Sequence, residues 1–141
     1  MLPLLQARIA DIWAILADCI AELTVVRVDY HAFKLKVVLT DGSALRINEQ
    51  YRQGVLEQYA YYWLTPDGQL RVGWDNVPHH RHLDTFPHHK HVESQENRVP
   101  SAETTPTEIL AAIRHSYPDD RASGCETSDV RPSAPWRAHH A

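Results

Sequence analysis

The sequence predicts an α+β fold in which an antiparallel β-meander of about five strands carries an N-terminal helix and a C-terminal helix packed on it. Three observations lead to this prediction. Apolar residues recur at helical spacing near the start of the chain, alternate with polar residues through its middle, and return to helical spacing after residue 105. Asp-Gly pairs between the alternating segments are typical of tight hairpins, which join antiparallel neighbours.

Residues 3–22 are predicted to form an amphipathic helix. Its apolar residues at helical spacing are Leu5, Ile9, Ile12, Leu16 and Ile20. We expect this stripe to lie against the sheet, and the alternative is a docking face for a partner protein.

The first predicted hairpin turns at Asp41-Gly42. From residue 23 onward apolar and polar residues alternate, with a break near residues 29–32 where a tight reversal is expected. A two-residue loop at Asp41-Gly42 would mix apolar and polar residues on each face. A three-residue loop with Gly42 in a left-handed conformation keeps the apolar residues on one face, so we predict that register. It pairs Val37 with Leu45 and Leu35 with Ile47.

A second hairpin is predicted after a polar connection at residues 49–54. Its strands are residues 59–64 and 70–74, joined by Pro66-Asp67-Gly68. The same loop register would make Leu64, Tyr62 and Ala60 the core face, opposite Leu70, Val72 and Trp74. The other face would carry Tyr59, Tyr61 and Trp63 and end at Asp75. We interpret this aromatic face as a binding surface, with Gly73 leaving room for Tyr61 or a ligand. The alternative is that a helix covers it.

The last predicted element is a helix that begins after Thr105. Thr105-Pro106-Thr107-Glu108 has the form of a capping box with proline at the first helical position, and the helix should end near Tyr117-Pro118. Residues 1–118 are therefore expected to form a single domain. Residues 119–141 are rich in polar and charged residues without an apolar period, so we expect a disordered tail there.

The composition excludes several classes of function. The net charge is −4 and the isoelectric point is near 6.2, so any binding to nucleic acid must use a local basic patch. Cys19 and Cys125 offer neither a disulfide framework nor zinc-finger spacing. We find no secretion signal and no membrane-spanning stretch, and expect a cytoplasmic protein with no membrane contact. Glycine-rich phosphate loops and a G-x-S-x-G motif are also lacking.

The histidines gather in one segment. Six of the ten lie between Trp74 and His91, where Pro78-His79-His80-Arg81-His82 returns nine residues later as Pro87-His88-His89-Lys90-His91. Imidazoles titrate near neutral pH and bind metals, so this density indicates acid/base, metal or phosphate chemistry. The prolines favour an extended backbone, and we expect a loop here.

Several motifs together resemble the TumE family, the toxin components of bacterial type II toxin–antitoxin systems. They are Phe33-Lys34-Leu35-Lys36, Leu39-Thr40-Asp41-Gly42-Ser43, Tyr61-Tyr62-Trp63, Trp74-Asp75-Asn76-Val77-Pro78-His79-His80 and Thr85-Phe86-Pro87-His88-His89-Lys90-His91. The resemblance extends from the first helix to about Tyr117. It implies a small toxin made beside a cognate antitoxin, often a helix-turn-helix protein, that holds it inactive.

The first hypothesis for the chemistry is a ribonuclease that needs no cofactor. Cleavage of RNA needs a base, an acid and a cation at the phosphate. The candidates for acid, base and orienting groups are His79, His80, His88, His89, His91 and Asp75. The candidates for binding RNA, by stacking on a base or contacting phosphate, are Tyr59, Tyr61, Trp63, Arg71, Asn76, Arg81 and Lys90.

Two further hypotheses remain open at this point. The same histidines could hold a divalent metal, Zn²⁺, Mn²⁺ or Fe²⁺, in a hydrolase, with His79, His88 and Asp75 as the ligand set. Because neighbouring side chains on an extended chain point opposite ways, only about half of the histidines could meet at one ion. The segment could instead be a non-catalytic module that binds an antitoxin or another protein.

Overall fold

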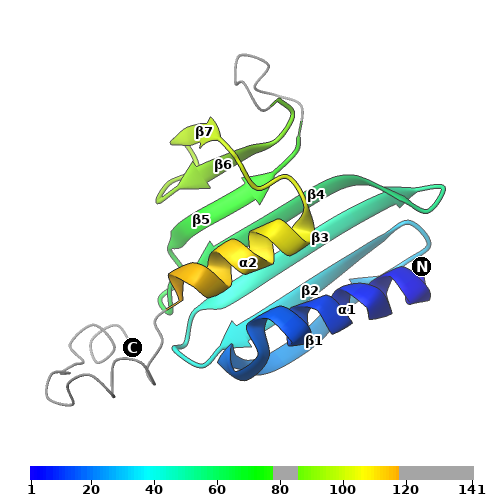
Figure 1. The fold of residues 1–141 in the computed structure, drawn as a ribbon, viewed down its shortest axis with the longest axis horizontal. Helices are drawn as coiled ribbons and strands as arrows, with labels where there is room; N and C mark the ends of the chain where they lie inside the picture. The colour runs from blue at the N-terminus through cyan, green and yellow to red at the C-terminus, as the bar shows by residue number, and fades with distance from the viewer. Residues whose placement is uncertain (78–85, 118–141) are drawn as a thin grey trace, which may run out of the picture.

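The computed structural model describes residues 1–77 and 86–117 of the chain (Figure 1). The predicted tail, residues 119–141, lies outside the described residues. The elements in chain order are α1 (Leu2–Leu16), the short 3-10 helix η1 (Ala17–Cys19), β1 (Ile20–Val28), β2 (Ala32–Leu39), β3 (Ala44–Arg52), β4 (Val55–Leu64), β5 (Leu70–Asp75), β6 (His89–Val92), β7 (Arg98–Pro100) and α2 (Pro106–Ser116).

The seven strands form one antiparallel sheet in sequence order, with β1 and β7 at its edges. The predicted α+β meander with a helix at each end of the chain is thus confirmed. The two strands beyond the five expected are β6, which lies in the histidine segment predicted as a loop, and β7, which follows it. Apart from Val92 and Val99 their residues have little preference for strands, so pairing determines their conformation: β6 pairs with β5, and β7 pairs with β6.

Both helices cover the same face of the sheet, as Figure 1 shows. The helices contribute Leu5, Ile12, Leu16, Ile109, Leu110 and Ile113 to the core. The strands contribute Phe33, Leu35, Val37, Leu39, Leu45, Ile47, Tyr51, Tyr59, Tyr61, Trp63 and Trp74. Among the described residues no helix covers the opposite face, which we call the outer face.

The first helix is shorter than predicted. It ends at Leu16, and Ile20 is already the first residue of β1. The chain leaves the helix through Ala17, whose φ is 33°. Leu16 and Ile20 fit a helical stripe by their spacing, but the same spacing also suits a helix end followed by a strand start. Periodicity therefore could not locate this boundary.

The first predicted hairpin is confirmed in its register. Leu35 pairs with Ile47 and Val37 with Leu45, and Gly42 has a φ of 88°. The polar connection expected at residues 49–54 is wrong, because β3 continues to Arg52 and β4 begins at Val55. Two residues with positive φ make this turn, as tight hairpins require.

The register predicted for the second hairpin is wrong by one residue along most of its length. Leu64 pairs with Leu70 as expected, but Trp63 pairs with Val72 and Tyr61 with Trp74. The shift lies between Leu64 and Trp63, where Arg71 is the extra residue of a β-bulge. A bulge adds one residue to one strand, so every later pair changes partner.

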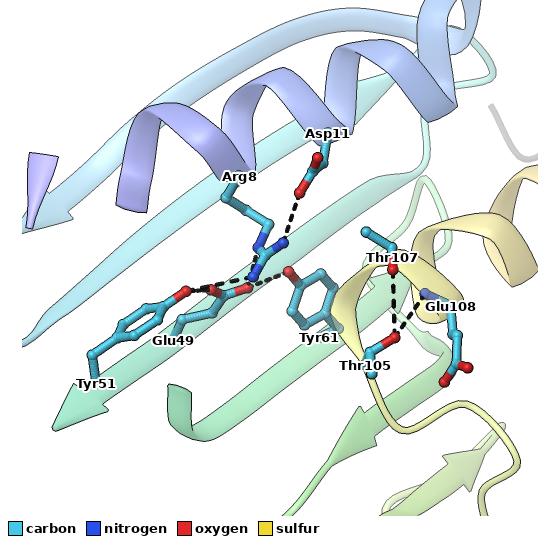
Figure 2. Close-up of polar contacts among 8 residues, drawn as sticks. All are labelled: Arg8, Asp11, Glu49, Tyr51, Tyr61, Thr105, Thr107 and Glu108. Carbon is cyan, nitrogen blue, oxygen red and sulfur yellow. Dashed lines mark hydrogen bonds and ion pairs between the residues drawn. The ribbon is translucent and has the colours of Figure 1, made fainter. Parts of the chain in front are cut away.

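The cap of α2 agrees with the prediction. The Thr105 hydroxyl accepts a hydrogen bond from the backbone N–H of Glu108 at 3.3 Å, as drawn in Figure 2. The Glu108 carboxylate in turn accepts from the backbone N–H of Thr104 at 2.9 Å. The helix ends at Ser116, next to the expected Tyr117-Pro118. Tyr117 ties this end to the first hairpin, because its hydroxyl accepts from the backbone N–H of Asp41 at 2.8 Å.

Candidate functional site

The candidate site lies on the outer face, where β5 and β6 run side by side. Asp75 pairs with His89, and Gly73 pairs with His91. Directly paired residues of an antiparallel sheet point to the same face, and so do residues two apart on one strand. The Asp75, His89 and His91 side chains therefore converge. We call these three residues the Asp-His-His cluster.

The cluster is held by short contacts in a buried setting. His89 Nε2 lies 2.8 Å from Asp75 Oδ1, and His91 Nε2 lies 3.1 Å from Asp75 Oδ2. The two imidazole rings have centroids 5.1 Å apart and are nearly perpendicular. Asp75 and His89 are each 3% exposed and His91 is 4% exposed. One carboxylate is thus shared by two imidazoles almost out of contact with solvent.

Each member of the cluster has a second partner that fixes its orientation. Asp75 accepts hydrogen bonds from the Tyr62 hydroxyl at 3.0 Å and from the backbone N–H of Val77 at 3.1 Å. His89 Nδ1 lies 3.1 Å from the carbonyl oxygen of Pro87, and His91 Nδ1 lies 2.9 Å from that of Gln95. These contacts fix the orientation of the Asp75 carboxylate and of both imidazole rings.

Tyr62 reaches Asp75 because Gly73, its cross-strand partner on β5, has no side chain. A Cβ atom on Gly73 would lie only 2.2 Å from Tyr62 Cδ1. The sequence interpretation that Gly73 leaves room for Tyr61 or a ligand is corrected here, since Tyr62 occupies that space. Burial and the negative charge of Asp75 raise the pKa of Tyr62 above its usual value, so the hydroxyl keeps its proton and donates.

The alternation of the histidine segment separates His88 and Lys90 from the cluster. The His88 ring stacks on Tyr59, and its Nδ1 lies 2.8 Å from the Tyr59 hydroxyl. Lys90 Nζ lies 3.4 Å from a Glu103 carboxylate oxygen. Burial lowers the pKa of His88. Of the three described histidines of this segment, His89 and His91 meet and His88 does not. His79, His80, Arg81 and His82 lie outside the described residues.

The aromatic face predicted as a binding surface belongs to the core. Tyr59, Tyr61 and Trp63 are buried beneath the helices, and their side chains are not available in this structure to stack on a base. The bulge at Arg71 is the reason, because it reverses which face of β5 each residue of β4 meets. The alternative that helices cover this face is the correct interpretation.

Two further candidates support the sheet. The side-chain oxygen of Asn76 accepts a hydrogen bond from the backbone N–H of Tyr59 at 2.8 Å, and its amide donates to the Glu57 carbonyl at 3.1 Å. Arg71 lies over the Trp63 ring, with its guanidinium carbon 4.5 Å from the ring centroid. These contacts hold β5 and the residue that follows it against β4.

Sequence reasoning missed a second polar cluster, which lies between α1 and the sheet (Figure 2). Glu49 is fully buried. It accepts hydrogen bonds from the Tyr51 and Tyr61 hydroxyls and pairs with Arg8, whose Nε lies 2.8 Å from Glu49 Oε2. Arg8 also pairs with Asp11 at 2.8 Å. The signal was a carboxylate in the apolar phase of a strand, which requires a buried partner.

The comparisons with known proteins assign the chain to a class. A family model described as Toxin TumE matches residues 13–117, which is more than half of the chain. The protein is therefore a toxin, of the kind made together with an antitoxin. It belongs to the TumE family. Searches of curated proteins and of solved structures gave no match.

The match confirms the resemblance that the sequence motifs carry, and the family implies a cognate antitoxin as partner. The matched residues contain the whole Asp-His-His cluster and the Glu49–Tyr61 contact, whereas Arg8 lies before them. In the described ranges, no helix is long and apolar enough to cross a membrane.

Proposed function

We propose that this toxin inhibits growth by cleaving RNA, and that the Asp-His-His cluster is the centre at which the phosphodiester bond breaks. The observation that carries the proposal is a pair of residue rows crossing the outer face. Cross-strand partners on β2 to β6 form the first row, which is Lys36, Arg46, Tyr62, Gly73 and His91. The second row is Lys34, Asn48, Ala60, Asp75 and His89.

These rows join exposed cations to the cluster. Lys34, Lys36 and Arg46 are exposed, and within the described part of the chain none of them forms an ion pair. Because neighbouring strands lie about 4.8 Å apart, Arg46 on β3 is about 10 Å from Gly73 on β5. A nucleic-acid strand lying across the sheet would place phosphates over these cations. This is the local basic patch that a protein of negative net charge requires.

The cluster supplies groups suited to phosphodiester cleavage. His89 and His91 offer two imidazoles for proton transfer, and Asp75 orients both. RNA is the favoured substrate because its 2′-hydroxyl serves as an internal nucleophile that DNA lacks. With exposed fractions of 3–4%, the cluster needs a local rearrangement before a phosphate can touch it. His88, predicted as a catalytic group, is not part of this proposal because it faces Tyr59.

The test compares growth and RNA cleavage for the wild type and a His89→Gln/His91→Gln variant. The full chain is expressed with and without the neighbouring antitoxin, and the purified protein is incubated with RNA and with DNA of the same sequence. Each reaction is run in excess chelator and again with added Zn²⁺ or Mn²⁺. We expect growth arrest and RNA cleavage only for the wild type, with DNA left intact.

His31→Ala and His115→Ala are the matched controls, because both histidines are exposed, His31 between β1 and β2 and His115 on α2. They should keep full toxicity. RNA that stays intact under every ionic condition would reject the ribonuclease. Toxicity that survives in the double variant would favour the non-catalytic, protein-binding alternative instead.

A further inference from the structure

The hydrogen-bond partners of His89 and His91 indicate which ring nitrogen of each residue bears the hydrogen. In both residues Nδ1 faces a backbone carbonyl oxygen, at 3.1 Å for His89 and 2.9 Å for His91. A carbonyl oxygen can only accept, so each Nδ1 must carry the hydrogen. A neutral imidazole holds one N–H, and its other nitrogen then has a lone pair. Both histidines therefore direct an Nε2 lone pair at Asp75.

A lone pair cannot bond to a carboxylate oxygen. His89 Nε2 is nevertheless 2.8 Å from Oδ1, and His91 Nε2 is 3.1 Å from Oδ2. One added proton, on either imidazole or on the carboxylate, would turn only one of these two contacts into a hydrogen bond and leave the other repulsive. Two added protons would satisfy both contacts but bury a net positive charge, which is costly. A cation between the three side chains removes the same repulsion without extra protons.

The hydrogen bonds of Asp75 also suit its carboxylate to bind a cation. Tyr62 donates to its Oδ2 and the backbone N–H of Val77 donates to its Oδ1. Each oxygen thus has one donor and directs its remaining electron density toward a histidine. Each of the three side chains is thus held by hydrogen bonds to a neighbouring group, as the ligands of protein-bound metal ions usually are.

We propose that Asp75, His89 and His91 bind one divalent transition-metal ion, with Zn²⁺ as the first candidate and Mn²⁺ or Fe²⁺ as alternatives. Their donor atoms lie within 4.8 Å of one another. Two imidazoles and a carboxylate form a ligand set that suits these ions, and three protein ligands leave a position open for solvent or substrate. Binding of the ion does not depend on the proposed ribonuclease activity. An ion held there would occupy the Nε2 atoms, so His89 and His91 would no longer transfer protons and the ion would supply the ribonuclease with a Lewis acid instead.

This ligand set differs from the one predicted from the sequence, which was His79, His88 and Asp75. Asp75 is common to both. His88 lies on the helix side of the sheet against Tyr59, and His79 lies outside the described residues. The strand alternation of β6 selects His89 and His91 together, since residues two apart point to one face.

The test measures metal binding directly, on the full chain without a histidine tag. The protein is stripped with a chelator and titrated with Zn²⁺ by calorimetry in the presence of a competing chelator, and with Co²⁺ by visible absorption. We expect one Zn²⁺ per chain and a Co²⁺ spectrum typical of four ligands. Replacing a ligand, as in His91→Gln, should reduce affinity by more than about 100-fold, since removing only a hydrogen-bond partner of a ligand costs about 10–100-fold.

Tyr62→Phe is the second variant, because it removes a supporting hydrogen bond and keeps all three ligands. Its affinity should fall by about 10–100-fold. Zn²⁺ should also raise the melting temperature of the wild type and of His31→Ala/His115→Ala, but not that of His91→Gln. Circular dichroism confirms that each variant is folded before its affinity is compared.

Two results would overturn the metal site: wild-type protein that binds none of these ions at micromolar concentration, or a His89→Gln/His91→Gln variant that binds Zn²⁺ as tightly as the wild type. The two proposals fail separately. A bound ion with RNA left intact removes the ribonuclease and keeps the metal site, whereas cleavage by protein shown to bind no metal does the reverse.

Discussion

The Tyr62 ring lies over Gly73, and this contact predicts the effect of a single methyl group. In Gly73→Ala the new Cβ would lie 2.2 Å from Tyr62 Cδ1 and 2.5 Å from Cε1, so the ring must move. Overpacking of this kind costs about 1–3 kcal/mol of stability, and the hydrogen bond to Asp75 is lost with it. Chemical denaturation and Zn²⁺ titration should both detect the change.

A double variant isolates that contact. Gly73→Ala should cost less in a Tyr62→Ala background, because no ring remains to be displaced. Equal costs in the two backgrounds would mean that Tyr62 is not what Gly73 accommodates.

The buried pair of Arg8 and Glu49 predicts a large effect on stability. Arg8→Met would leave the Glu49 carboxylate buried with only two tyrosine hydroxyls as partners, and breaking such a pair costs about 3–5 kcal/mol. The double variant Arg8→Met/Glu49→Met should recover part of the loss, because no buried charge remains. Urea unfolding measures all three proteins. A double variant less stable than Arg8→Met would contradict the prediction.

The same cluster predicts instability at alkaline pH. Burial and the hydrogen bond to Glu49 raise the pKa of Tyr51 to about 12, whereas a tyrosine in the unfolded chain titrates near pH 10. Between these values the unfolded state has lost more protons, so the free energy of unfolding falls as the pH rises, by up to about 1.4 kcal/mol per pH unit for one group. Tyr51→Phe should make this decline shallower in urea unfolding at pH 9 to 11.5. An unchanged slope would count against it.

At the level of single residues the sequence predicted the importance of Asp75, His89 and His91 but not their grouping. The sequence shows that histidines are concentrated in this segment. Which of them meet at one site depends on the face of β6 to which each side chain points. Tyr62 was placed in the core because the bulge at Arg71 was not foreseen. Glu49 was passed over as part of a polar connection, because its partner Arg8 is distant in sequence and only the fold brings them together.

At the level of elements, loss of the cap of α2 should lower the stability of the protein by a moderate amount. Thr105→Ala removes the hydroxyl that accepts the Glu108 N–H, and should cost about 1 kcal/mol in the free energy of unfolding. Thr107→Ala is the matched control, since Thr107 is exposed on the same turn and makes only a 3.4 Å contact with Thr105. Thermal and urea unfolding should rank the two variants. Similar losses in both would show that the cap contributes little.

Elements were predictable where one local signal determined them. Asp41-Gly42 gave the correct register, because the apolar alternation on both sides agreed with it. The bulge at Arg71 had no such signal, because Leu70, Val72 and Trp74 are spaced as they would be in a regular strand although Leu70 faces the opposite side. Without the bulge, the two faces of β4 were exchanged in the prediction. The buried residues Tyr59, Tyr61 and Trp63 were therefore predicted as a binding surface. His89–Val92 became a strand through pairing with β5, which propensity does not reveal.

On the scale of the whole molecule, the two faces of the sheet have different roles. Helices cover one face and enclose the apolar core, and the outer face carries Lys34, Lys36 and Arg46 toward the Asp-His-His cluster. If RNA crosses this face, its affinity must depend on salt through the phosphates that these side chains neutralise. Each lost contact lowers the slope of log K against log salt by about 0.7 for a single strand.

Lys36→Gln and Arg46→Gln should therefore each weaken binding and reduce the salt slope, most when combined. Fluorescence anisotropy with a 2′-O-methyl oligonucleotide measures binding without cleavage. Arg114→Gln is the control, because Arg114 lies on α2, which covers the other face, and it should leave the slope unchanged. A slope that fell equally in all three variants would mean that the charge effect is global. A slope that fell only for Arg114→Gln would place the RNA on the helix face, away from the cluster.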